Sequence, residues 1–425
     1  MEATLTKNER EVAVLVGVFT DSSEERKCTQ SLLELENLAL TAGATVYGVL
    51  TQAREKPLAT TYIGSGKLLE LKVLCENADA DLVIFDDELS PSQIKNIEEV
   101  LPHKVRAIDR TMLILDIFAL HAKTAEGILQ VKIAALKYSL PRLSGKGSEM
   151  SRLGGGIGTR GPGESKLESD RRHIRRKIAE LESQLRDLET SRNQQRSQRK
   201  KSEITQVAIV GYTNAGKSTL LNALTDAGVL SEDKLFATLD PTVRKYTLES
   251  GLEILLLDTV GFINKLPHNL VEAFRSTLDE AVYADIVIMM TDASDKEAEA
   301  QLEVTETLLS ELGAADKPTL CVFNKCDREG ERIPRAPSSV PKENVFYLSA
   351  KTGQNVDAFV ARLGELVNES TSRVSFAIPM ARQDIVAGLY RVARVEDVSY
   401  EGEMTYVTAV CDARAKGMYR EWIRR

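Results

Sequence analysis

The chain has 425 residues, 43 % of them hydrophobic, and a formal net charge of −8. Its five cysteines are scattered without a CxxC pair, and only four histidines are present. We therefore expect neither a disulfide framework nor a zinc site. The charged first eleven residues lack the apolar core of a signal peptide, and no apolar run reaches the roughly 18 residues of a membrane span. We therefore expect a soluble, cytoplasmic protein with no membrane span. We also expect it to be a monomer.

The predicted elements begin with a small α/β domain over residues 1–110. Apolar runs at 12–19, 45–50 and 81–85 predict strands, and helical spacing predicts helices over 28–41, 66–76 and 90–101. Ser90-Pro91 is a typical helix start. A glycine-rich stretch at Gly64–Lys67 resembles half of a phosphate-binding motif, but Thr61 and Leu68 stand where that motif requires other residues. We interpret it as a strand-to-helix turn.

Residues 111–203 predict a long antiparallel helical hairpin. Helices are expected over 112–140 and 165–198, joined by a glycine-rich loop at 145–163. The second helix carries an apolar heptad seam, which consists of Leu167, Ile174, Ile178, Leu181, Leu185 and Leu188. Such a seam is typical of a helix that packs against one partner helix.

The hairpin carries an excess of positive charge in an acidic chain. Residues 141–203 contain 16 Lys or Arg against 9 Asp or Glu. A basic run is most often a solvated helix face, yet this one adjoins arginines on a flexible glycine loop, which can approach RNA closely. The predicted RNA contacts are Arg152, Arg160, Arg171 and Arg172.

Residues 204–370 predict a nucleotide-binding domain. The apolar strand 206–210 runs into Gly-Tyr-Thr-Asn-Ala-Gly-Lys-Ser-Thr at 211–219, followed by a helix. Gly211 and Gly216 permit backbone N–H groups to point at phosphate oxygens, Lys217 would reach the β- and γ-phosphates, and Ser218 would bind Mg²⁺.

Two further motifs stand at predicted strand ends. Asp258-Thr-Val-Gly261 places a carboxylate near the metal and the Gly261 N–H near a γ-phosphate. Asn324-Lys-Cys-Asp327 indicates guanine, because one carboxylate accepts both of its adjacent N–H donors, whereas adenine would leave buried groups unpaired. Ser349-Ala350-Lys351 would close over the base. All lie at the carboxyl ends of strands, where open α/β sheets bind ligands.

The segment 236–242 lies between the glycine motif at 211–219 and Asp258, and it contains two threonines suited to complete Mg²⁺ coordination, Thr238 and Thr242. Phe262 occupies the position where glutamine commonly orients the attacking water. Phenylalanine can neither donate nor accept, so we expect slow hydrolysis by the free protein. The expected catalytic residues are Lys217, Gly261, Phe262 and one of the two threonines, Thr238 or Thr242. The residues expected around the nucleotide are Gly211, Tyr212, Thr213, Asn214, Ala215, Gly216, Lys217, Ser218, Thr219, Phe236, Ala237, Thr238, Leu239, Asp240, Asp258, Thr259, Val260, Gly261, Asn324, Lys325, Cys326, Asp327, Ser349, Ala350 and Lys351.

Residues 374–425 predict a small α+β domain with the order strand, helix, strand, strand, helix, and a tight bend at Gly402. The whole fold class is therefore α/β. A P-loop GTPase domain with a mostly parallel sheet follows a small α/β domain and a helical hairpin, and precedes this appendage.

Over essentially its whole length the chain resembles the HflX family of ribosome-associated GTPases. The most specific similarity is the segment from Arg152 through Arg160 and Gly163 to Arg172, followed by the motifs at 211–218, 236–240 and 258–262. The resemblance implies binding to the large ribosomal subunit and its rRNA, partial ribosome association, and the splitting or rescue of stalled or idle ribosomes under stress. It also implies GTP as substrate, Mg²⁺ held by Ser218 and Thr238, and the choice of Thr238 over Thr242.

Three other functions remain open. A GTPase of ribosome biogenesis would bind immature particles, an RNA-remodelling protein would use ATP through its N-terminal domain, and a signalling switch would leave the basic hairpin without a purpose.

Overall fold

The structure is a computed structural model that describes residues 11–142, 162–201, 204–225, 236, 242–265, 280–328 and 333–424. The chain forms two compact units. The first comprises Met1–Leu188 together with Glu232–Asp240 and Ile263–Ser276, and the second comprises Glu189–Ser231, Pro241–Phe262 and Thr277–Arg425. Two short segments, one before and one after the motif at 258–261, thus belong to the N-terminal unit. The predicted domain boundaries stay predictions.

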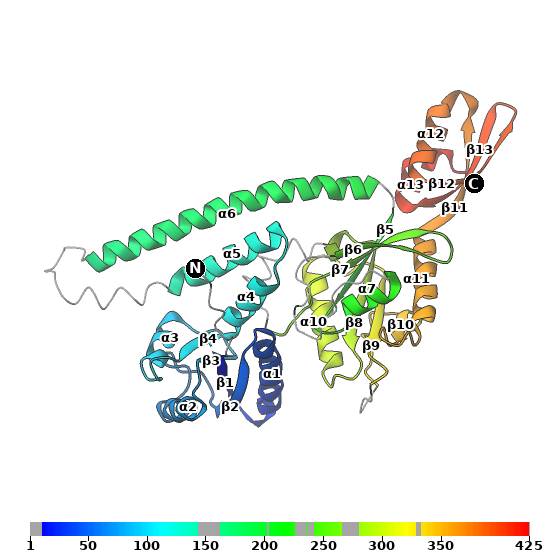
Figure 1. The fold of residues 1–425 in the computed structure, drawn as a ribbon. Coiled ribbons are helices and arrows are strands. Elements are labelled where there is room, and N and C mark those ends of the chain that lie inside the picture. The colour runs from blue at the N-terminus through cyan, green and yellow to red at the C-terminus, as the bar shows by residue number, and fades with distance from the viewer. Residues whose placement is uncertain are drawn as a thin grey trace, which may run out of the picture. The chain divides into compact units, whose positions relative to one another are not determined.

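A four-stranded parallel sheet forms the centre of the first unit (Figure 1). Its order is β2-β1-β3-β4, with bounds Val12–Phe19 for β1, Thr45–Ala53 for β2, Leu82–Phe85 for β3 and Arg106–Asp109 for β4. Strand β3 is buried on both faces, as expected where helices cover a parallel sheet. The three predicted strands are confirmed. The sequence interpretation missed β4, because only four residues with two charges form it.

Three helices accompany this sheet and confirm the predicted pattern. They are α1 (Ser22–Thr41), α2 (Ser65–Ala78) and α3 (Pro91–Glu98). Asp21 caps α1 through the N–H groups of Ser23 and Glu24, which explains why that helix begins earlier than its apolar spacing suggested. Ser90 and Gln93 form a capping box on α3. The interpretation of residues 64–67 as a helix start is confirmed, and Lys67 pairs with Glu70.

The single helix predicted over 112–140 is wrong, because two helices occupy this region. These are α4 (Arg110–His121) and α5 (Ala125–Ser139). Thr124 accepts a hydrogen bond from the N–H of Gly127, at 3.0 Å, and this cap starts the second helix. The predicted long helix exists as α6, Pro162–Lys201, and buries Ile178 and Leu181 of the seam. Lys137 of α5 and Glu182 of α6 form an ion pair of 2.8 Å.

The second unit contains a six-stranded sheet of order β10-β9-β8-β5-β7-β6. Its strands are β5 (Thr205–Gly211), β6 (Thr242–Thr247), β7 (Glu253–Asp258), β8 (Ile286–Asp292), β9 (Thr319–Asn324) and β10 (Val345–Tyr347). Only β6 among them runs antiparallel to its neighbour. The described helices packed with it include α7 (Lys217–Thr225), α10 (Ala298–Glu311) and α11 (Val356–Ser370). The carboxyl ends of β5, β7 and β9 lead into the three predicted motifs.

A small antiparallel sheet of order β11-β13-β12 completes the second unit. Strand β11 (Thr371–Pro379) follows α11 directly, and α12 (Gln383–Val392), β12 (Arg394–Glu401), β13 (Met404–Asp412) and α13 (Ala413–Met418) come next. Gly402 turns the hairpin with φ of +61°. The predicted element order is confirmed. Within the described ranges, no helix is both long and apolar enough to cross a bilayer.

Candidate nucleotide-binding site

Glycine is required at both ends of the turn between β5 and α7. Gly211 has φ of +151° and Gly216 has φ of +92°. A side-chain carbon at Gly211 would lie 2.0 Å from the carbonyl oxygen of Met290, and one at Gly216 would lie 2.2 Å from Nδ2 of Asn324. The turn therefore approaches its neighbours too closely for any other residue, and α7 begins at Lys217 with its free N–H groups facing the turn.

Lys217 lies inside this turn with 7 % of its surface exposed. Its Nζ donates to the carbonyl oxygens of Gly211, at 3.1 Å, and Tyr212, at 2.9 Å. Burial lowers the pKa of Lys217 to about 8, although the charge of Asp258 acts in the opposite direction. An ammonium held by neutral carbonyls in a buried position is a strong attractor for an anion such as a phosphate.

The second motif meets the first at two points. The Ser218 hydroxyl donates to Oδ2 of Asp258, at 2.6 Å, and Asp258 is fully buried at the end of β7. Gly261 lies against the turn, because a side-chain carbon there would be 2.8 Å from Cα of Thr213 and 2.9 Å from Nζ of Lys217. Thr259 instead donates to the carbonyl oxygen of Ile209, at 2.8 Å, which is a structural contact.

Asn324 connects the third motif to its neighbours on both sides. Its Nδ2 donates to the carbonyl oxygen of Ala215, at 2.9 Å, and its Oδ1 accepts from the N–H of Ala350, at 2.9 Å. Lys325, which has φ of +65°, pairs with Asp292 at 2.8 Å and reaches Oδ1 of Asn214 at 3.4 Å. The three predicted loops are therefore joined into one site.

Asp327 is positioned by the last motif. The Ser349 hydroxyl donates to its Oδ1, at 2.6 Å, and this hydrogen bond holds the pKa of Asp327 below its ordinary value. The N–H of Thr352 donates to Ser349 in turn, at 3.2 Å, and the N–H of Cys326 donates to the carbonyl oxygen of Leu348, at 3.2 Å. An ionised carboxylate held at this point can accept the paired N–H donors of guanine.

Phe262 is buried, with 1 % of its surface exposed, and its backbone pairs with the turn. Its N–H donates to the carbonyl oxygen of Gly211, at 2.9 Å, and its carbonyl oxygen accepts from the N–H of Thr213, at 2.7 Å. The side chain offers no group to a water molecule, consistent with the expectation of slow unassisted hydrolysis.

Three further predicted residues lie on other described elements. Phe236 packs edge-to-face on Phe118 of α4 in the first unit, with ring centroids 4.7 Å apart. Arg171 and Arg172 lie on α6. Outside the described residues lie Ala237, Thr238, Leu239, Asp240, Arg152 and Arg160.

The sequence interpretation overlooked a charged cluster in the first unit. Asp86 and Asp87 directly follow the buried strand β3, and Arg110 directly follows β4. Two carboxylates after an apolar run of four residues were a signal that could have indicated it.

A strand, a glycine turn that holds a buried lysine, a Ser–Asp pair and a carboxylate held by Ser349 form the arrangement of a GTP-hydrolysing P-loop protein. Family models agree with this geometry over most of the chain. Residues 29–119 match the model described as "GTP-binding GTPase N-terminal", 121–199 that described as "GTP-binding GTPase Middle Region", and 206–325 that described as "50S ribosome-binding GTPase".

Curated relatives extend over nearly the full length. "GTPase HflX" of Caldanaerobacter subterraneus is 48 % identical over 96 % of this chain and 93 % of the relative. "GTPase HflX" of Escherichia coli is 39 % identical to this chain, and the match covers 91 % of this chain and 90 % of the relative. A solved GTP-binding protein of Sulfolobus solfataricus in complex with GDP is 26 % identical, covers 84 % of this chain and 99 % of its own, and has a TM-score of 0.46. The chain belongs to the HflX family of GTPases, and its activity is GTP hydrolysis.

Proposed function

We propose that this GTPase binds the large ribosomal subunit and its rRNA, and that its GTP cycle controls docking and the splitting or rescue of stalled or idle ribosomes. The observation that carries the proposal is the match of residues 206–325 to a family of 50S ribosome-binding GTPases. Partial ribosome association in the cell follows from it.

The long helix α6 supports this proposal through its charge. Arg172, Arg175, Arg176 and Lys177 are exposed on this 40-residue helix. Closely spaced cations on one helix favour a phosphate backbone as partner, because each contact releases a condensed counterion. Together with Arg171, Arg152 and Arg160 they form the proposed rRNA contact.

The nucleotide is proposed to bind where the loops meet. Lys217 and the N–H groups at the start of α7 would bind the β- and γ-phosphates, and Asp327 would select guanine. Ser218 and Asp258 present two oxygen ligands side by side, which fits the preference of Mg²⁺ for hard oxygen donors. We propose that they hold Mg²⁺, Asp258 through water, with Thr238 as a further ligand. When bound, the ion would neutralise charge that develops on the phosphates.

Hydrolysis is proposed to depend on the ribosome. Because Phe262 cannot orient a water molecule, the attacking water needs a group supplied by a partner or by a rearranged loop. Intrinsic rates of such enzymes are near 10⁻⁴ per second and assisted gains reach about 10⁵. GTP turnover titrated with purified mature large subunits tests this, with a large saturable increase expected. Fast hydrolysis that is independent of subunits contradicts it.

Sedimentation tests the docking step separately. The protein with a non-hydrolysable GTP analogue should co-sediment with mature large subunits, and with GDP it should not. Preference for immature particles would favour a role in ribosome biogenesis. ATP-driven RNA unwinding that persists in a Lys217→Ala variant would favour the RNA-remodelling alternative.

A further inference from the structure

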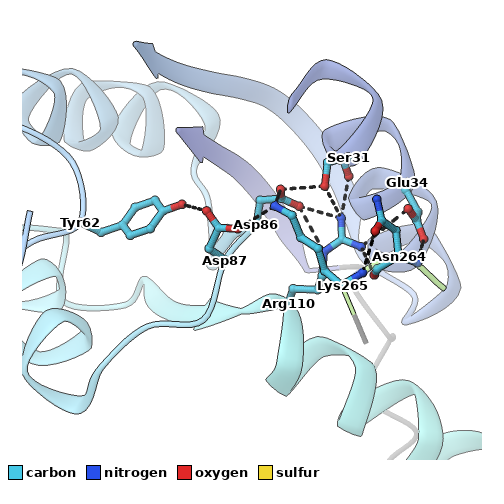
Figure 2. Close-up of polar contacts among 8 residues, drawn as sticks. All are labelled: Ser31, Glu34, Tyr62, Asp86, Asp87, Arg110, Asn264 and Lys265. Atoms are coloured by element: carbon cyan, nitrogen blue, oxygen red, sulfur yellow. Dashed lines mark hydrogen bonds and ion pairs between the residues drawn. The ribbon is translucent and has the colours of Figure 1, made fainter. Parts of the chain in front are cut away.

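The charged cluster in the first unit lies where the parallel strands end. Strand β1 pairs with β2 on one side and β3 on the other, so the ends of β1 and β3 flank the point where connections diverge, the usual ligand position of an open α/β sheet. Asp86 and Asp87 follow β3, Arg110 begins α4 and Glu34 lies on α1. We call these four residues the Lys265 cluster, because Lys265 binds among them (Figure 2).

Lys265 and its neighbour are held by both side chain and backbone. The Lys265 ammonium donates to Oδ2 of Asp86 and to Oδ1 of Asp87, each at 2.6 Å. The N–H of Asn264 donates to Oε1 of Glu34, at 3.2 Å, and its carbonyl oxygen accepts from Nη1 of Arg110, at 3.3 Å. Four separate contacts therefore fix a two-residue segment.

The backbone of this segment is strained, which indicates that the contacts determine it. Lys265 has φ of +55°, in the left-handed region that residues with a side chain rarely adopt. Tyr62, whose hydroxyl donates to Asp87, has φ of +64°. Such conformations persist where the surroundings over-determine them, and they gather at binding and switching sites.

The cluster has the charge of a receptor for a cation. It contains three carboxylates and one guanidinium, and Arg110 and Asp86 are each 2 % exposed and joined at 2.6 Å. Burial would raise the pKa of Asp86, but Arg110 and Lys265 hold it below its ordinary value, and the two aspartates raise the pKa of Lys265 against the effect of burial. The Lys265 ammonium offsets part of the excess negative charge of these side chains, whereas a phosphate would be repelled.

The other end of the same short segment bears on the nucleotide site. Phe262, three residues before Lys265, is bridged to Gly211 and Thr213 in the second unit, and Gly261 lies against Lys217. Gly261 and Lys217 thus flank the position expected for a γ-phosphate. Only two residues, Ile263 and Asn264, separate Phe262 from Lys265, so the same short segment connects the nucleotide site to the contacts of Lys265.

We propose that Lys265 is a positioning residue for the GTPase reaction and that the Lys265 cluster couples the N-terminal unit to the γ-phosphate. Binding of Lys265 in the cluster holds the Phe262 bridge closed, and a bound γ-phosphate opens the bridge and withdraws Lys265. The two events oppose each other, and by linkage each weakens the other by the same factor. The proposal concerns GTP binding itself and does not depend on the ribosome.

Nucleotide affinities test it. Lys265→Ala in the full-length protein should raise the affinity for a non-hydrolysable GTP analogue about 5- to 10-fold, the lower part of the usual range of coupling, while the affinity for GDP changes less than about twofold. Asp87→Asn should act in the same direction. Lys265→Ala combined with Asp87→Asn should raise the affinity for the GTP analogue no more than the more effective single change does. Either change alone abolishes the same interaction.

Two controls distinguish coupling from general loosening. Lys265→Arg keeps the cation and should restore the wild-type preference between the two nucleotides. Lys245→Ala removes another lysine from an exposed ion pair, with Glu253, and should change neither affinity. An unchanged ratio of GTP to GDP affinity in Lys265→Ala overturns the proposal, and so does an effect of Lys265→Ala that Asp87→Asn fails to reproduce.

Discussion

The side-chain amide of Asn324 donates a hydrogen bond of 2.9 Å to the carbonyl oxygen of Ala215. The same side chain accepts from the N–H of Ala350, so that one residue joins three loops of the nucleotide site. Since the partners are buried, loss of this side chain would leave a carbonyl and an N–H without hydrogen bonds, at about 1–3 kcal/mol each.

Asn324→Ala should therefore weaken the binding of GTP and GDP alike by about 30-fold or more, because the two losses together cost at least about 2 kcal/mol and 1.4 kcal/mol corresponds to a factor of ten. Equilibrium titration with fluorescent nucleotides measures this. Asn96→Ala is the matched control, because the side-chain amide of Asn96 also donates to a backbone carbonyl oxygen, that of Thr60 at 2.8 Å, and the residue lies in the first unit, outside the nucleotide site. Equal affinities in wild type and Asn324→Ala would show that the loops are held by other contacts.

Asp327→Asn should change which purine is bound. Its carboxylate is held by Ser349 in an ionised form suited to the two donors of guanine, and the amide of asparagine replaces one acceptor by a donor. We expect a loss of GTP affinity of about 10²- to 10⁴-fold. Xanthosine triphosphate, which carries a carbonyl in place of the exocyclic amine, should bind the variant better than GTP. Retained preference for GTP would place guanine recognition elsewhere.

Lys217 gives nucleotide binding a dependence on pH. Its pKa of about 8 in the free protein lies below the ordinary value of 10.5, whereas bound phosphates favour the charged form. Affinity is thus fully present below pH 8 and falls as pH rises above it, because binding must then take up a proton. Calorimetry of GDP binding in two buffers of different ionisation enthalpy should show an uptake of about half a proton at pH 8. Absence of uptake between pH 7.5 and 9 would contradict a lowered pKa.

Arg110 should be essential to the stability of the first unit. It begins a helix, where a positive charge opposes the helix dipole, and it is buried against Asp86 and the backbone of Ser31. In Arg110→Met, the half-exposed Lys265 would be the remaining cation beside the buried carboxylate of Asp86. The substitution should lower the free energy of unfolding by about 3–5 kcal/mol. Hydrogen exchange of the β3 and β4 amides measures this locally. Arg110→Lys should lose less stability than Arg110→Met. Equal protection of the β3 and β4 amides in wild type and Arg110→Met would show that Arg110 does not stabilise the first unit.

The nucleotide site could be predicted because the functional groups of each motif lie within a few consecutive residues. The parallel strands that lead into Gly211, Asp258 and Asn324 then bring the motifs to one edge of the sheet. The bonds that join them, such as those of Asn324 to Ala215 and Ala350, required the fold. The break between α4 and α5 was missed because the apolar spacing continues through it, and only the cap at Thr124 marks it.

The Lys265 cluster could not be predicted in the same way. Arg110 and Asn264 are 154 positions apart, and no periodicity connects them. A buried arginine at a helix start also contradicts local preference, so sequence rules alone would assign it to the surface. Its position becomes understandable only when the carboxylates after β3 are seen beside it.

The anchoring of Phe236 on Phe118 has a practical consequence for work with fragments of this GTPase. A truncated chain beginning near residue 204 would contain every nucleotide motif, yet it would lack the aromatic partner of Phe236 and the acidic partners of Lys265. Phe236 and Lys265 would then lack the contacts that the first unit provides. Kinetic constants measured on such a shortened enzyme would describe a relaxed form, and their differences from the intact chain would measure how strongly the N-terminal half controls turnover.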